Sequence, residues 1–137
     1  MTNNKKNILS SFATKAAQRL DDKKIPKHAK LYIPSLDEEI KIRSLNRKEI
    51  MECMNVDDSE AEPDRGDNYT IYLAVIEPSL KDIARELKEE GKIVEYVEVC
   101  NIFEMHERAS IAREIMKLSG VMAGDKTVTV VNEIKNS

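Results

Sequence analysis

The first candidate for chemistry is the pair His106-Glu107, because it begins the HExxH pattern of zinc proteases. That pattern needs a second histidine four residues after the first, so that both imidazoles lie on one helical face and bind the same ion. Ser110 stands at that position, and the other histidine, His28, is far away in the sequence. The spacing therefore favours a solvated helix residue at His106 over a zinc ligand.

Two other motifs each fail at one decisive residue. Residues 120–127 approach a phosphate-binding P-loop, but Asp125 replaces the glycine before the lysine, and its carboxylate would repel a phosphate. The acidic residues 58–62 approach a calcium-binding loop, but Pro63 occupies the position where the turn needs glycine. We therefore predict no catalytic residue, no cofactor site and no metal ligand, and a protein that is not an enzyme.

Composition limits the compartment and the size of the fold. The chain has 137 residues, which suits one domain with one modest core. No apolar run approaches the roughly 20 residues that span a bilayer, and no apolar segment follows the basic N-terminus as in a signal peptide. The two cysteines, Cys53 and Cys100, are far apart and form no CxxC pair. These features predict a protein of the reducing cytoplasm that is neither secreted nor bound to a membrane.

Charge is distributed unevenly along the chain. Residues 1–50 hold 12 lysines and arginines against six acidic residues, whereas residues 51–137 hold 10 against 19. A basic arm of this kind favours a small nucleic-acid-binding or regulatory protein as the alternative function. However, no helix carries the cluster of Arg, Asn and Gln that reads base edges, so nucleic acid is the less favoured partner. A salt-dependent gel shift would support this alternative, whose contacts would be lysines 5, 6, 15, 23, 24, 27 and 30.

Apolar spacing in the first half predicts a helix, a hairpin and a short second helix. Residues 8–20 form one helical stripe that ends before Pro26. Residues 31–43 alternate apolar and polar side chains on either side of a Pro-Ser turn, which is typical of a small hairpin. Asn46 is an expected N-cap with Glu49 as its capping-box partner, opening a helix through Met54.

The second half is predicted to be mainly helical. Residues 55–67 are expected to form an acidic loop, and residues 69–76 suit either a helix or a buried strand. Ser79 caps a helix that stops at Gly91, and two more apolar stripes follow, of which the second ends at Gly120. Residues 127–131 suit a short strand or a disordered end. We expect an α+β, mainly α fold, with an arm and linker at 1–27, a globular domain at 28–120 and a tail at 121–137.

Four segments carry a resemblance to a known family. They are residues 31–36 (LYIPSL), 40–50 (IKIRSLNRKEI), 76–82 (IEPSLKD) and 111–120, which ends KLSG; residues 134–136 (IKN) match the usual finish. In these segments the chain resembles the XkdN-like tail assembly chaperones of long-tailed bacteriophages and prophages. The resemblance covers nearly the whole chain after the N-terminal arm, and its motifs consist of hydrophobic spacing with a few Pro, Ser and Gly residues.

The resemblance implies a role in tail morphogenesis. Proteins of this family are thought to coat the tape measure protein, a long helical chain prone to aggregation, until the tail tube forms around it, and to be absent from the finished virion. The resemblance also implies a longer product made by a ribosomal frameshift, which is a candidate partner. A homo-oligomer is a further candidate, which the sequence does not decide.

A chaperone of this kind needs apolar, adaptable surface beside the hairpin. We expect the apolar faces of residues 80–118 to form the core and the binding groove to border the hairpin. The side chains predicted to contact the client are Leu31, Ile33, Leu36, Ile40, Ile42, Leu45, Met51, Met54, Tyr69 and Tyr72.

Overall fold

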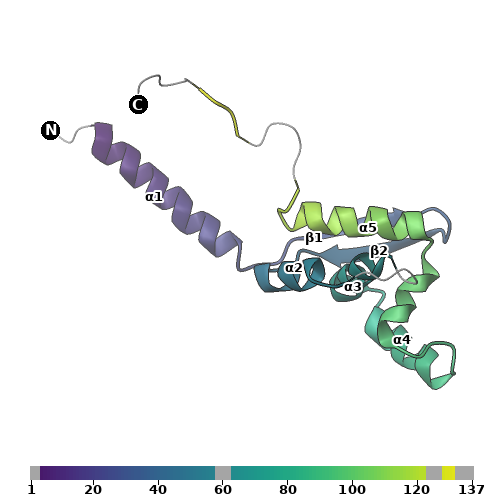
Figure 1. Cartoon of the computed structure of the whole chain (residues 1–137). Helices are drawn as coiled ribbons and strands as arrows, with labels where there is room; N and C mark the ends of the chain where they lie inside the picture. The colour runs from purple at the N-terminus through teal and green to yellow at the C-terminus, as the bar shows by residue number, and fades with distance from the viewer. Residues whose placement is uncertain (1–3, 58–62, 123–127, 132–137) are drawn as a thin grey trace.

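The computed structural model is a small, mainly helical α+β fold, as predicted, and its antiparallel sheet has three strands, one more than the predicted hairpin (Figure 1). It describes residues 4–57, 63–122 and 128–131, with side chains from Ser10 onward. The elements are α1 (Asn4–Asp22), β1 (His28–Ile33), β2 (Glu38–Arg43), α2 (Arg47–Met54), α3 (Arg65–Ala74), β3 (Val75–Glu77), α4 (Leu80–Glu89), the 3-10 helix η1 (Tyr96–Ile102) and α5 (Met105–Leu118).

The predicted hairpin is confirmed as β1 and β2, and β3 extends it on the far side of β2. Leu31 lies opposite Ile40, which puts both side chains on the inner face, where Ile33 and Ile42 are also buried. The strand order makes β1 and β3 the two edge strands, and no described residue pairs with the outer side of β1. The sheet therefore has one face in the core, and its β1 edge lies beside α5.

The cap predicted at Asn46 is confirmed. The Asn46 side chain accepts a hydrogen bond from the Glu49 N–H at 2.8 Å, and the Glu49 carboxylate accepts one from the Asn46 N–H at 3.0 Å. The same carboxylate pairs with both terminal nitrogens of Arg43 at 2.9 and 2.7 Å. The guanidinium of Arg43, together with the cap, lowers the pKa of Glu49 and fixes the start of α2 against the end of β2.

The predicted loop at residues 55–67 is wrong for its last three residues, because α3 begins at Arg65. Asp67 lies in the first turn of α3, where a carboxylate is favoured by the helix dipole. Residues 58–62 lie outside the described residues. The segment 69–76, which suited either a helix or a buried strand, contains both. It is helical through Ala74 and becomes strand β3 at Val75.

The predicted caps of the C-terminal half are confirmed. Ser79 accepts a hydrogen bond from the Asp82 N–H at the start of α4, and Gly91 and Gly120 take positive φ angles of 74° and 83° after α4 and α5. The stripe between these helices forms the short helix η1, in which Cys100 is buried.

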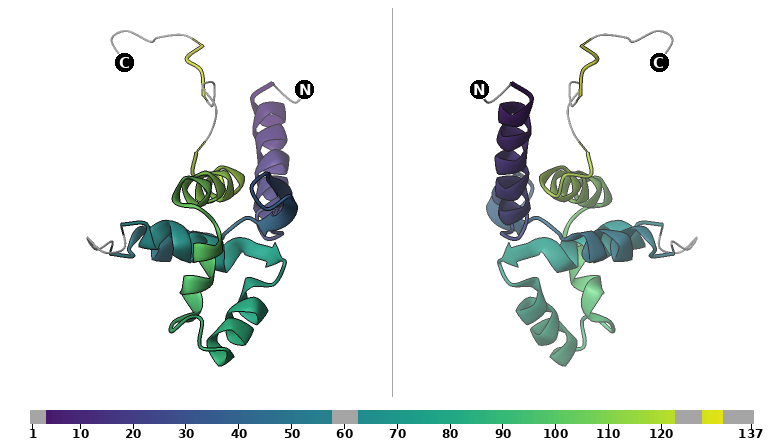
Figure 2. Two further views of the ribbon diagram at one scale, coloured as in Figure 1. Left: turned by 90° about the vertical axis from the view of Figure 1, so that its right-hand side faces the viewer. Right: turned by 90° about the vertical axis from the view of Figure 1, so that its left-hand side faces the viewer.

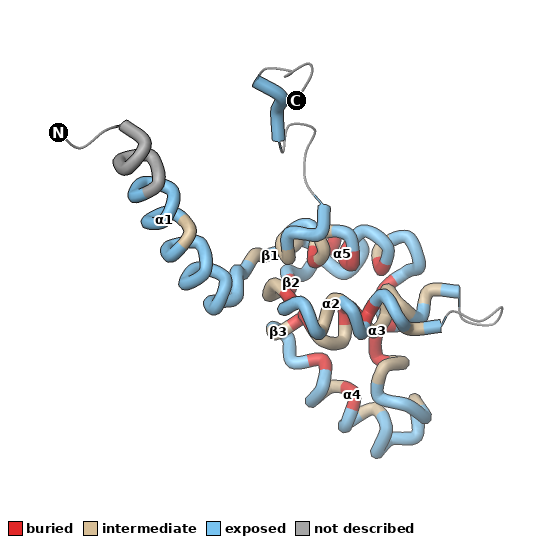
Figure 3. The backbone as a smooth tube through the Cα atoms, turned by 60° about the vertical axis from the view of Figure 1, so that its left-hand side comes forward, coloured by how far each residue is buried: buried red, intermediate tan, exposed pale blue. Residues whose placement is uncertain are grey.

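The core extends beyond residues 80–118, where it was expected. Ile115 and Val99 belong to that range, but Ile42 of the hairpin and Ile71 of α3 are buried equally deeply in the same cluster. Figure 3 shows the buried residues gathered between α3, α4, α5 and the sheet, while α1 from Ser10 onward is almost wholly exposed. Burying the inner face of the sheet thus takes helices from both halves of the chain.

A buried ion pair joins α5 to the segment before α3. Arg108, whose exposed fraction is 8%, places one terminal nitrogen 2.7 Å from Asp64 Oδ2 and donates from the other to Asn101 Oδ1 at 2.7 Å. Asp64 Oδ2 has this ion pair and no hydrogen-bond partner among the described residues. One guanidinium therefore holds the segment before α3 against η1 and α5, which lie about 40 residues further along the chain.

Burial also determines the reactivity of Cys100. Loss of hydration raises the pKa of its thiol to about 12, although the nearby Arg108 cation acts in the opposite direction. Because the thiolate is the reactive form, we expect native Cys100 to react with iodoacetamide at pH 8 about 1,000-fold more slowly than an exposed cysteine. Mass spectrometry with and without urea measures this ratio. Rapid labelling of Cys100 in the native protein would contradict the burial described here.

The ends of the described chain lie away from the core. The helix expected at residues 8–20 is confirmed as α1, which projects from the rest of the molecule in the views of Figure 2. Val128–Val131 form no strand, and Thr127 and the 134–136 finish lie outside the described residues. Within the described ranges, none of the helices combines the length and the apolar character needed to cross a membrane.

Candidate binding groove

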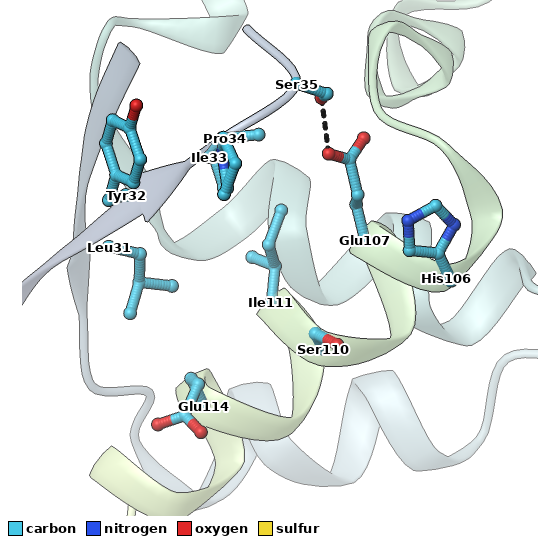
Figure 4. A pocket seen from close by; sticks show the side chains of 10 residues that line it. All are labelled: Leu31, Tyr32, Ile33, Pro34, Ser35, His106, Glu107, Ser110, Ile111 and Glu114. Atoms are coloured by element: carbon cyan, nitrogen blue, oxygen red, sulfur yellow. Dashed lines mark hydrogen bonds between the residues drawn. The ribbon is translucent and has the colours of Figure 1, made fainter. Parts of the chain in front are cut away.

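A groove of about 470 Å³ lies between β1 and α5. Leu31 and Ile33 line it from β1, Pro34 and Ser35 from the following turn, and Ile111 from α5 (Figure 4). Its polar lining comes mainly from α5, and includes His106, Glu107, Ser110 and Glu114. The groove thus has apolar walls and an acidic rim.

Contacts near the two ends of α5 fix its position beside β1. At one end, the Ser35 hydroxyl donates a hydrogen bond to the Glu107 carboxylate. At the other, the Leu45 N–H donates to Ser119 Oγ at 2.9 Å, and Ser119 Oγ donates to the Ile115 carbonyl at 2.7 Å. α5 therefore runs antiparallel to β1 and forms a wall along the β1 edge of the sheet.

One carboxylate of the acidic rim, that of Glu107, is held in its ionised form. The hydrogen bond from Ser35, reinforced by the Glu104 N–H at 2.8 Å, lowers the pKa of Glu107. Glu114, at the other end of the groove in Figure 4, pairs with Lys117 at 3.5 Å on an exposed surface, where such pairs are weak. An apolar ligand that carries basic groups beside its apolar face would match this site.

No family model, curated protein or solved structure matches the chain. The groove is therefore interpreted from its own residues. In the described part of the chain, no three His, Cys, Asp or Glu side chains come close enough together to hold a metal ion.

The predicted client-contacting residues are divided among different environments. Ile33, Ile40, Ile42 and Leu45 are buried in the core, and of these only Ile33 reaches the groove. The burial of Ile33, Ile40 and Ile42 follows from the hairpin register, which turns every second side chain inward, whereas Leu45 lies beyond the end of β2. Leu31 lines the groove and is half-buried.

The remaining predicted residues lie outside the groove. Leu36 is exposed at the hairpin turn, and Met51 and Met54 are exposed on α2. Tyr69 donates a hydrogen bond to Glu52 at 3.2 Å and lines a second hollow with Val56 and Tyr96. Tyr72 is half-buried against the core, and burial is the main cause of its raised pKa.

The α5 side of the groove was not among the predicted binding residues. Glu107, Ser110 and Glu114 flank the stripe of Ile111 and Ile115, so their position at the edge of an apolar face is visible in the sequence. What the sequence does not show is that β1 lies beside that edge. Helical spacing identifies a boundary residue, but its neighbour depends on the tertiary fold.

Proposed function

We propose that this protein is a tail assembly chaperone that binds apolar helical segments of the tape measure protein in the groove between β1 and α5. The observation that carries the proposal is the groove itself, with apolar walls and an acidic rim beside the hairpin. Amphipathic helices are commonly recognised by laying their apolar face into a groove of this kind. The resemblance in residues 31–50, 76–82 and 111–120 supplies the identity of the client.

The proposed role is non-enzymatic and belongs to the host cytoplasm. A long client with many apolar stripes aggregates unless those stripes are covered before assembly. Exposed methionines at positions 51 and 54 provide adaptable apolar surface outside the groove. In this proposal the groove holds an anchor side chain of the client, and the neighbouring surface on α2 extends the contact.

Filling the groove tests this proposal. Ser110 is exposed and lines the groove, so Ser110→Trp should occupy it without disturbing the core, whereas Ser110→Ala leaves it open. We expect the tryptophan variant to need about tenfold or more protein to suppress aggregation of a purified tape-measure fragment, measured by light scattering. The alanine variant should match the parent.

Urea denaturation of both variants controls for folding, because a change at an exposed position should alter the free energy of unfolding by no more than about 0.5 kcal/mol. Equal suppression by the tryptophan variant and the parent would reject the groove as the client site. Failure of the parent to suppress aggregation at all would reject the chaperone proposal.

A further inference from the structure

The helix α1 carries an apolar stripe whose two large side chains are exposed in the described structure. Phe12 and Leu20 have exposed fractions of 74% and 63%, and Ala16 lies between them at helical spacing. In proteins, most helical stability comes from packing an apolar face against another element and not from helix propensity alone. The stripe is therefore expected to be covered in solution.

The connection to β1 holds α1 away from its own groove. The Lys23, Lys24 and Ile25 N–H groups donate hydrogen bonds to carbonyls of the last turn of α1. No loose linker therefore separates α1 from Pro26. Lys27 is fixed to the end of β2, because its N–H donates to Ser44 Oγ and its carbonyl accepts from the Ser44 N–H, both at 2.8 Å. Folding α1 back within one chain would break these contacts.

We propose that two copies of the chain exchange their α1 helices, so that the stripe of each α1 occupies the groove between β1 and α5 of the other copy. Exchange of an element across a short connection is a low-cost route to a closed, twofold symmetric dimer. It buries the stripe of both copies and retains the ordered connection at residues 23–27. The occupant of the groove in the free protein is thus a second copy.

Length and charge match between the two surfaces. Phe12 and Leu20 are separated by about 12 Å along α1, and Glu107 and Glu114 by about 10 Å along α5. Lys15 and Arg19 directly precede Ala16 and Leu20, so they flank one side of the stripe. Seating the stripe in the groove brings these two cations toward the acidic rim, which favours association.

Cross-linking between separate variants tests the exchange directly. Phe12→Cys protein is mixed with Ser110→Cys protein and treated with a short bis-maleimide; the native cysteines, Cys53 and Cys100, are buried. We expect a cross-linked species of one copy of each variant. Thr14→Cys, on the opposite face of α1, should give little of that species when mixed with Ser110→Cys.

Equal cross-linking from positions 12 and 14 would overturn the proposal. A protein that carries both Phe12→Cys and Ser110→Cys and is cross-linked only within single chains would also overturn the proposal. In that case the groove would be occupied by the chain's own α1.

Sedimentation supplies a second, independent test. At about 100 µM the parent is expected to be a dimer, and Phe12→Glu should weaken dimerisation by about 100-fold or more, because each dimer contains the contact twice. Thr14→Glu adds the same charge on the opposite face and should leave the dimer intact. A monomeric parent at this concentration would contradict the proposal, and so would a Phe12→Glu variant that remains dimeric.

If the proposed function also holds, α1 and the client compete for one groove. Phe12→Glu should then suppress aggregation of the tape-measure fragment at lower protein concentration than the parent. This consequence rests on the proposed function, whereas cross-linking and sedimentation contain no client. Loss of the dimer with no gain in suppression would count against the shared groove and leave the exchange intact.

Discussion

Replacement of Asp64 by alanine is expected to lower the free energy of unfolding by about 3–5 kcal/mol. The change leaves the guanidinium of Arg108 almost fully buried, with Asn101 as its one remaining hydrogen-bond partner among the described residues. A buried cation without its counter-ion carries a desolvation cost that the remaining contact does not offset. Urea denaturation of the parent and the variant measures the difference.

The double variant Asp64→Ala, Arg108→Leu is the matched control. It removes both charges, so most of the lost stability should return even though the ion pair is gone. If the double variant is no more stable than Asp64→Ala alone, desolvation of Arg108 is not the cause. If Asp64→Ala costs less than about 1 kcal/mol, the pair is not buried as described.

The two phenylalanines of the chain form a matched pair for measuring how much core packing contributes to stability. Phe103 is 2% exposed at the end of η1, whereas Phe12 is 74% exposed on α1. Phe103→Ala is expected to lower the free energy of unfolding by about 3–5 kcal/mol, because it removes buried apolar area and leaves a cavity. Thermal and urea unfolding measure this loss.

Phe12→Ala makes the same chemical change at the exposed site. At concentrations low enough for both proteins to be monomeric, it should alter the free energy of unfolding by no more than about 0.5 kcal/mol. Equal losses at the two positions would show that η1 does not pack into the core as described.

Local signals predicted local structure well. The caps at Asn46 and Ser79 and the glycine stops at Gly91 and Gly120 depend on hydrogen bonds and backbone angles within a few residues. The hairpin was predictable for the same reason, because alternation and a turn lie in one short segment. These features need no knowledge of distant contacts.

Features that depend on distant contacts were missed. The segment 69–76 carries residues that suit both helix and strand, and the change at Val75 follows from pairing with Ile42 of β2. Arg108 looks like a solvated helix residue in the sequence, but Asp64 and Asn101 make it part of the interior. The groove was expected beside the hairpin, yet its α5 wall is formed by residues about 70 positions away, as the Ser35–Glu107 contact shows.

Hydrogen exchange of the full-length Phe12→Glu variant, whose groove is expected to be free of α1, with and without a saturating tape-measure fragment, tests the central claim most directly. A client helix in the groove should slow exchange of backbone amides in β1 and in residues 105–114 of α5, and leave α4 unchanged as an internal reference. Bound fragment with unchanged exchange in both walls of the groove would contradict the account.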